Sequence, residues 1–335
     1  MLTRKSANLI SESFRDARNY MDLSLLESMR VIALPTKTNF RGINVREVAL
    51  FQGEYGWGEF SPFLEYDYQE CAPWLMCAIE AATKPRPQLY RSSVRVNGTI
   101  PAINDMNVIK SLVETYQGVK TFKVKVGDSL GEDIVRLAQI RSLGRDIKIR
   151  IDVNGLWSVK DALTNLYAFY EEVGPFEYVE QPCATLEELR ELKASIHIPL
   201  KIAVDEALRK AKDPFAIDLS GAADLVMLKV QPLGGIARAH KLAEHHKLPV
   251  VVSSALESAV GISHGLALAA SFSVMNFDCG LATSSLLSAN VGDLPIINGE
   301  IEVKRIEPNF EGLEVSPERY KWWQDRLMKT WELIA

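Results

Sequence analysis

The feature that most constrains the fold is a repeated alternation that begins near residue 91. Short β-branched runs are followed, again and again, by amphipathic stretches of helical length. Strands are expected at 94–100, 122–126, 147–153, 176–180, 200–204, 225–230, 249–253 and 275–279. Helices between them are expected at 134–143, 159–170, 186–194, 237–246 and 259–272. Strands that alternate with helices are typical of a parallel α/β sheet, and this number of them favours a closed (β/α) barrel over an open sheet.

The segments on either side of this alternation differ from it. Residues 29–34 and 45–51 alternate apolar with polar side chains and stop at Gly53 and Gly56, which predicts antiparallel hairpins, and 68–84 has helical periodicity. After residue 285 come strand-like pieces at 294–297 and 301–303 and an amphipathic stretch at 322–334. We expect an α+β capping domain over 21–90, which the tail 286–335 rejoins, above a barrel of 91–285. Residues 1–20 are predicted to be an N-terminal extension.

Composition narrows the class of partner. The chain has 38 Lys and Arg and 43 Asp and Glu, which gives a net charge of −5. It lacks the excess of basic residues that is typical of proteins that bind nucleic acid or anionic membranes. No apolar run approaches the roughly 20 residues of a membrane span. The four cysteines form no CxxC pair, which predicts buried thiols in the reducing cytoplasm. No glycine-rich phosphate loop follows a strand. A small-molecule substrate is therefore expected.

Ionisable residues end five successive strands of the predicted barrel. They are Lys125, Asp152, Glu180, Asp205 and Lys229, and each interval is close to one strand–helix repeat. Barrel enzymes place their chemistry at the C-terminal ends of the strands. The five side chains are therefore expected to converge on one mouth, three carboxylates flanked by two ammonium groups.

Three carboxylates in one place repel one another unless a cation lies among them. Oxygen ligands suit Mg²⁺, with Mn²⁺ as a substitute, so a divalent metal on Asp152, Glu180 and Asp205 is the hypothesis. The alternative for each carboxylate alone is a helix cap after its strand. The flanking lysines favour the metal for the set.

The two outer lysines are candidates for acid–base chemistry. An ammonium that loses hydration beside a metal cation is expected to have a depressed pKa, so its neutral amine can act as a base. Lys125 and Lys229 are expected to approach a bound carboxylate substrate from opposite faces and to remove the proton next to its carboxylate. Lys123 shares a strand face with Lys125 and is expected to hold substrate or tune the base; an ordinary strand-end charge is the alternative.

These motifs carry a family resemblance. They are Lys-Val-Lys at 123–125, Asp-Val-Asn-Gly-Leu-Trp at 152–157, Glu-Gln-Pro at 180–182, Asp-Glu at 205–206 and Leu-Lys-Val-Gln-Pro-Leu-Gly-Gly from 228. The set resembles the enolase superfamily in its muconate-lactonizing subgroup. The resemblance implies a (β/α)₇β barrel, which is a modified TIM barrel, with an α+β capping domain. It also implies that Lys125 is the base, that Lys229 opposes it, and that the metal binds Asp152, Glu180 and Asp205.

Finer motifs at 40–42, 56–66, 252–257 and 279–283 resemble a dehydratase of this subgroup, of the actinobacterial type. This resemblance implies loss of water from a hydroxylated cyclohexadiene carboxylate to give an aromatic acid. The nearest alternative is racemisation of N-acylated amino acids by the same two lysines, and a non-catalytic barrel that serves as a binding protein is another.

Substrate contacts are also expected. Ser253 and Ser254 end the seventh strand, at the level where their hydroxyls can donate to a carboxylate. Further candidates are Arg150, Asn154, Gly234, Gly235 and Arg41. For Arg150, which shares a strand face with Asp152, pairing with a barrel carboxylate is an equal alternative.

Overall fold

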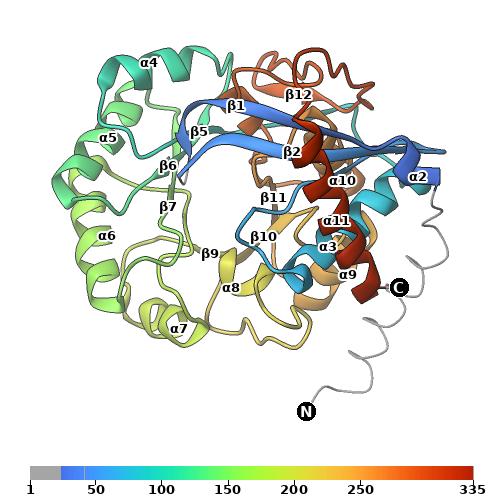
Figure 1. The fold of residues 1–335 in the computed structure, drawn as a ribbon. Coiled ribbons are helices and arrows are strands. Elements are labelled where there is room, and N and C mark those ends of the chain that lie inside the picture. Colours follow the sequence, from blue (N-terminus) through green and yellow to red (C-terminus); the bar gives the residue numbers. More distant parts are fainter. Residues whose placement is uncertain (1–23, 41, 335) are drawn as a thin grey trace.

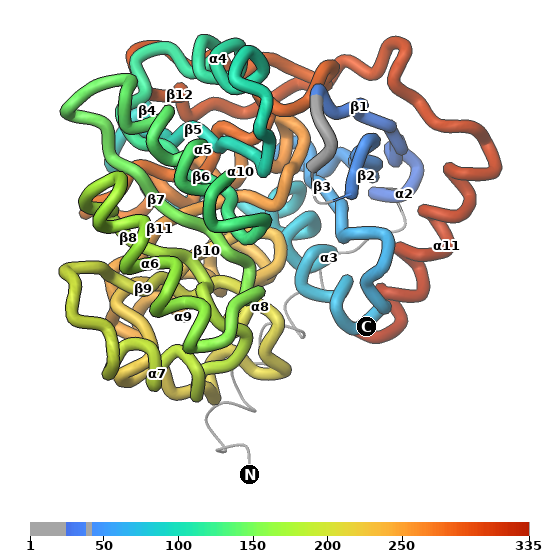
Figure 2. The backbone as a smooth tube through the Cα atoms, turned by 90° about the vertical axis from the view of Figure 1, so that its left-hand side faces the viewer, coloured from blue at the N-terminus to red at the C-terminus, as the bar shows by residue number. Residues whose placement is uncertain are grey.

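The computed structural model describes residues 24–40 and 42–334, so the expected extension over 1–20 lies outside the described residues. Two structural units lie side by side (Figures 1 and 2). The larger unit is a barrel ringed by helices, and the smaller unit contains the β1–β2 hairpin, α3 and the C-terminal helix.

The barrel is built on seven parallel strands in chain order. They are β5 (Gly98–Ile100), β6 (Thr121–Lys125), β7 (Lys148–Asp152), β8 (Tyr178–Glu180), β9 (Ile202–Val204), β10 (Leu225–Lys229) and β11 (Val250–Ser253). Residues 279–280 close the sheet, because Gly280 pairs with Ser253, the last residue of β11, and Cys279 pairs with Val96 just before β5. The eighth expected strand is thus reduced to two parallel bridges. The predicted (β/α)₇β barrel is confirmed.

Most of the helices that follow the strands start at side-chain caps. The barrel helices are α4 (Met106–Glu114), α5 (Leu130–Ser142), α6 (Val159–Val173), α7 (Leu186–Ser195), α8 (Glu206–Arg209), α9 (Ile236–His246) and α10 (Ala259–Ser271). Ser129, Ser158, Thr185 and Ser258 each accept a hydrogen bond from a first-turn N–H. The exceptions are α8 and α9. All residues of α10 are buried, because it contacts β3 of the smaller unit as well as β11.

The smaller unit is the predicted cap. An antiparallel sheet joins β1 (Arg30–Phe40), β2 (Ile43–Gly53) and β3 (Gly56–Phe60), preceded by the short α2 (Ser24–Glu27). Beside it pack α3 (Tyr68–Thr83), which starts at an Asp67–Glu70 capping box, and α11 (Pro317–Ile334). Trp74 and Phe60 share one apolar cluster with Trp323 of α11. Both ends of the described chain therefore build the cap, as expected.

The tail returns differently from the prediction. The expected strand 94–100 is split, because β4 (Ser93–Arg95) pairs antiparallel with β12 (Glu300–Glu302) and only β5 joins the barrel. No strand forms at 294–297, where one bridge closes a turn. The chain then reaches β1, where Ala33 N–H donates to Leu313 O at 2.8 Å. The domain limits predicted from the sequence, at 21–90, 91–285 and 286–335, stay predictions.

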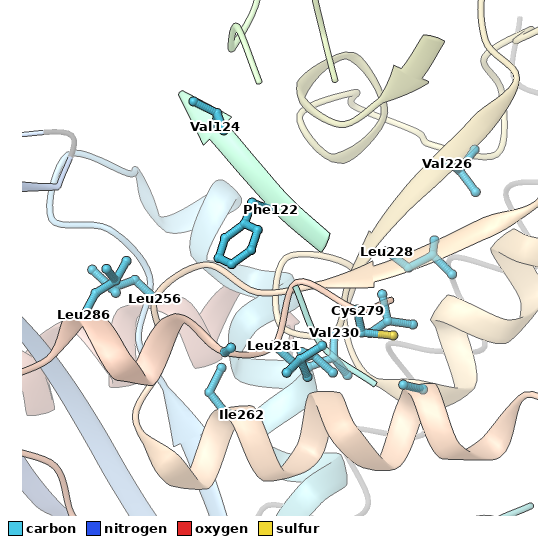
Figure 3. Packing of buried hydrophobic residues seen from close by; sticks show 14 of the residues in the cluster. Phe122, Val124, Val226, Leu228, Val230, Leu256, Ile262, Cys279, Leu281 and Leu286 are labelled. Atoms are coloured by element: carbon cyan, nitrogen blue, oxygen red, sulfur yellow. The ribbon is translucent and has the colours of Figure 1, made fainter. Parts of the chain in front are cut away.

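Apolar packing holds the barrel to its helices. The main cluster contains Phe122 and Val124 of β6, Leu228 of β10 and Ile262 of α10 (Figure 3). Cys71, Cys77, Cys183 and Cys279 are buried and free, which confirms the expected thiols. Of the helices that the structure describes, none combines the length and apolarity that a membrane crossing requires.

Candidate active site

The interior of the barrel has two layers. Tyr178, Ala203, Leu225, Met227 and Val251 form a small apolar cluster. Because alternate residues of a strand point to the same side, the residues two positions later face the same interior. These are Glu180, Asp205, Lys229 and Ser253. An apolar plug therefore supports a charged layer at the C-terminal ends of the strands.

The strand register places the charged residues at one level. Lys125 pairs with Asp152, and Asp152 pairs with Glu180 across β6, β7 and β8. On the other side of the barrel, Lys229 pairs with Ser253. The register therefore brings Lys125, Asp152 and Glu180 to one level, and Lys229 to the level of Ser253.

On the β6–β8 side, lysines bind the carboxylates directly. Lys123 Nζ lies 2.8 Å from Asp152 Oδ2 and 3.0 Å from Glu180 Oε2, and Lys125 Nζ lies 3.1 Å from Asp152 Oδ2. Both carboxyl groups are buried. One ammonium group therefore bridges two of the three proposed metal ligands.

On the β9–β10 side, Asp205 has two cationic partners. Lys229 Nζ lies 2.6 Å from Asp205 Oδ2, and Arg209 Nε lies 3.1 Å from Oδ1. Arg209 also binds Glu206 Oε1 at 2.9 Å and Tyr66 OH at 3.1 Å. The sequence reasoning missed Arg209; its spacing of four residues from Asp205 on a helical turn was the available signal.

Burial and charge shift the pKa values of this layer in opposite directions. Burial, followed by repulsion from Asp152, raises the pKa of Glu180 to about 7. Burial acts to lower the pKa of Lys123, but the Asp152 and Glu180 carboxylates outweigh it and raise that pKa well above its ordinary value. For Asp205, attraction from Lys229 and Arg209 outweighs the effect of burial and lowers the pKa. The cations therefore compensate for burial at Asp205 but not at Glu180.

The three carboxylates suit a divalent cation by their chemistry. All are oxygen ligands at the ends of neighbouring strands, and Lys123 shows that one positive charge can contact Asp152 and Glu180 together. Over residues 24–40 and 42–334, no three His, Cys, Asp or Glu side chains are arranged as a ready metal cluster. The carboxylates bind lysines and an arginine instead, so a metal ion would compete with these cations.

A pocket opens above the charged layer. Lys123, Lys125, Asp152, Lys229, Ser253 and Ser254 line it, all of them candidates from the sequence. The sequence reasoning did not select the other lining residues, which are Phe63, Thr99, Arg209, Ala255, Leu256, Gly280 and Thr283. Because Phe63 follows β3 of the cap, both units contribute to the pocket.

Arg150 lies elsewhere. Its guanidinium is fully buried, with Nε 2.7 Å from Glu177 Oε2 and Nη1 donating to Asn97 Oδ1 at 2.9 Å. The guanidinium carbon also lies 4.8 Å from the centroid of the Tyr178 ring. Arg150 therefore pairs with a carboxylate of the barrel, which was the alternative to substrate binding, and it does not line the pocket.

Asn154 and the paired glycines are also outside the pocket lining. Asn154 Nδ2 donates to Glu206 Oε1 at 3.1 Å. Gly234 and Gly235 have φ of 88° and 107°, and a Cβ on Gly235 would lie 2.6 Å from Glu80 Oε1. These glycines let α3 of the cap approach α9 closely. Arg41 lies outside the described residues.

Comparison with known proteins agrees with this architecture. Residues 108–317 match the model of the enolase C-terminal domain-like family, and residues 31–82 match that of the enolase N-terminal domain-like family. The L-Ala-D/L-Glu epimerase from Bacillus subtilis is a similar solved structure, with a TM-score of 0.68 at 22% identity over 86% of this chain and 98% of that one. The muconate lactonizing enzyme from Pseudomonas putida has a TM-score of 0.67 at 17% identity over 88% and 97%. At these identities the likeness concerns the fold.

A closer relative is similar over nearly its whole length. The o-succinylbenzoate synthase of Mycobacterium ulcerans is 43% identical over 317 residues, which cover 92% of this chain and 95% of the relative. The chain therefore belongs to the enolase superfamily and, within it, to the o-succinylbenzoate synthase family.

Proposed function

We propose that the chain removes water from 2-succinyl-6-hydroxy-2,4-cyclohexadiene-1-carboxylate to give o-succinylbenzoate, a step of menaquinone biosynthesis. The observation that carries the proposal is the placement of Lys125 and Lys229 in one pocket, on β6 and β10, with the three carboxylates at the ends of the strands between them. The relatives are named for this synthase activity, which does not favour the racemase or binding-protein alternative.

The reaction breaks one C–H and one C–O bond. The neutral amine of Lys125 takes the proton from the carbon next to the ring carboxylate, and the resulting ammonium returns it to the departing hydroxyl, which leaves as water. Lys229, held by Asp205 at 2.6 Å, supplies a fixed positive charge beside the enediolate that forms. The electron pair from the C–H bond completes the aromatic ring.

We assign metal binding to Asp152, Glu180 and Asp205, with Mg²⁺ as the ion and Mn²⁺ as its substitute. When bound, the ion supplies positive charge that stabilises the negative charge developing on the substrate carboxylate. Ser253 and Ser254 line the same pocket and are proposed to donate hydrogen bonds to the substrate. Lys123 is proposed to hold substrate or to tune Lys125 through Asp152, which both lysines contact.

The partner is thus a small carboxylate, and we place the reaction in the cytoplasm because the four cysteines are free thiols.

The lysine roles can be tested with matched variants. Lys125→Ala and Lys229→Ala are each expected to lower kcat for dehydration by roughly 10²–10⁴-fold, the range of a positioned proton-transfer group. Lys120→Ala is the control, because Lys120 is exposed and precedes the opposite end of β6. Dehydration is followed by the ultraviolet absorbance of the cyclohexadiene. A kcat within about threefold of the wild type in either active-site variant contradicts that residue's role.

A further inference from the structure

A buried polar cluster joins the cap to the wall of the pocket. It consists of Arg46 on β2, Glu59 on β3 and Glu257 just before α10, with exposed fractions of 2%, 3% and 1%. Charged side chains are almost never buried to this extent unless they are paired or hydrogen-bonded. The proton-transfer scheme uses none of the three.

Arg46 directs its donors to the backbone of the pocket wall. Its Nε donates to Leu256 O at 3.1 Å, and its Nη2 donates to Ser61 O. Its guanidinium also stacks over the Phe63 ring, 4.7 Å from the centroid. Both Leu256 and Phe63 line the pocket. One buried cation thus contacts a barrel residue and a cap residue that both line the pocket.

Leu256 needs such support. Its φ of 63° lies in the left-handed region of the backbone. Residues other than glycine populate this region less than the right-handed one, by roughly tenfold or more. The Leu256 side chain belongs to the main core cluster (Figure 3). Backbone of this kind persists only where neighbouring groups hold it, and it is concentrated at ligand sites.

The neighbours of Leu256 are fixed as well. Ala255 N–H donates to Glu257 Oε2 at 2.6 Å, and Ser258 N–H donates to Glu59 Oε1 at 3.2 Å. The hydrogen bond from Arg46 lies between these two. The segment that continues β11 from Ser253 into α10 is therefore held at three successive points, two of them from the cap.

We propose that Arg46 is a positioning residue that shapes the substrate pocket, by holding Leu256 and Phe63 against the part of the substrate that the lysines and carboxylates do not bind. The inference rests on the proposed function, because the succinyl side chain of that substrate needs such a wall. Arg46 acts at a distance from the proton transfer, so it controls affinity more than chemistry.

The first test is a split between KM and kcat. Arg46→Met is expected to raise KM for the cyclohexadiene substrate about tenfold or more while kcat changes less than about threefold. Arg86→Met is the control, because Arg86 also donates to backbone carbonyls, those of Ser263 and Lys304, but neither of these two residues lines the pocket. Its KM and kcat are expected to stay within about twofold of the wild type. An unchanged KM in Arg46→Met, or a fall in kcat alone, overturns the proposal.

A double-mutant cycle tests the role of the strained residue. Leu256→Gly lets residue 256 adopt its φ without strain. The effect of Arg46→Met on KM is therefore expected to be several-fold smaller in the Leu256→Gly background. Strictly multiplicative effects of the two substitutions overturn the proposal. If Arg46→Met does not fold, Arg46→Lys, which retains the charge but not the fork of donors, replaces it in both tests.

Amide hydrogen exchange separates this inference from the proposed function. The amides of 254–257 are expected to exchange faster in Arg46→Met than in Arg86→Met, without reference to any substrate. Equal exchange in the two variants overturns the positioning role. A wild-type protein that does not dehydrate the cyclohexadiene contradicts the proposed function instead. The hydrogen-exchange comparison still tests the positioning role of Arg46 in that case.

Discussion

Glu59 is predicted to be the strongest polar link between the cap and the barrel. Its Oε1 accepts hydrogen bonds from Ser61 Oγ at 2.7 Å, Gln231 Nε2 at 3.2 Å and Ser258 N at 3.2 Å. Its Oε2 accepts from Ser258 Oγ and from Gly261 N at 2.9 Å. A carboxylate of the cap thus accepts the first N–H groups of a barrel helix, where negative charge is most favourable.

The substitution Glu59→Gln keeps the shape and removes the charge. If the amide nitrogen replaces Oε2, the hydroxyl of Ser258 can rotate to accept, but Gly261 N–H faces a donor. A lost hydrogen bond to a charged group costs about 1.5–3 kcal/mol. The lost attraction between the charge and the helix N-terminus adds about 0.3–1 kcal/mol. The free energy of unfolding is therefore expected to fall by about 2–4 kcal/mol.

Urea unfolding followed by tryptophan fluorescence measures this loss. Glu54→Gln is the matched control, because Glu54 is an exposed residue of the turn between β2 and β3, and it is expected to change the free energy by less than about 0.5 kcal/mol. A loss below about 1 kcal/mol for Glu59→Gln contradicts the reasoning, since the buried donors would then have other acceptors.

Three further outcomes are expected. EDTA abolishes dehydration and Mg²⁺ or Mn²⁺ restores it, whereas full turnover in rigorously metal-free protein contradicts the assignment of the three carboxylates. Burial, followed by repulsion from Glu59, raises the pKa of Glu257 from 4.5 to about 7. The folded state therefore retains this proton between these pH values, and the free energy of unfolding falls as the pH rises through them. Glu257→Gln is expected to flatten this slope in urea unfolding at several pH values, and an unchanged slope contradicts the role of Glu257. Gly235→Ala is expected to lower the melting temperature more than Gly312→Ala, because both have a positive φ but only at Gly235 does a Cβ meet a carboxylate; equal shifts contradict the steric argument.

The barrel and its charged layer could be predicted because both depend on local periodicity. A strand residue and its second neighbour point to the same side, so the ends of β6 to β10 revealed which ionisable groups face inward. Arg150 shows the limit of that rule. It faces the same interior as Asp152 but one layer lower, beside Tyr178, and only the register between strands reveals its pairing with Glu177.

The contacts between cap and barrel could not be predicted, because they join residues far apart in the sequence. Glu59 lies 202 residues from Gly261, and Arg46 lies 210 residues from Leu256. Nothing in the local pattern around Gly234 and Gly235 separates a glycine that approaches substrate from one that lets α3 approach α9. For the same reason, the split of residues 94–100 between β4 and β5 depends on the returning strand β12.

The most direct test of the proposed function compares two activities of one wild-type preparation in Mg²⁺. Dehydration of the cyclohexadiene carboxylate is followed by ultraviolet absorbance, and racemisation of N-succinyl amino acids is followed by polarimetry. We predict that kcat/KM for dehydration exceeds that for racemisation. Racemisation without dehydration would contradict the proposed function, although the same lysines and carboxylates would serve both reactions.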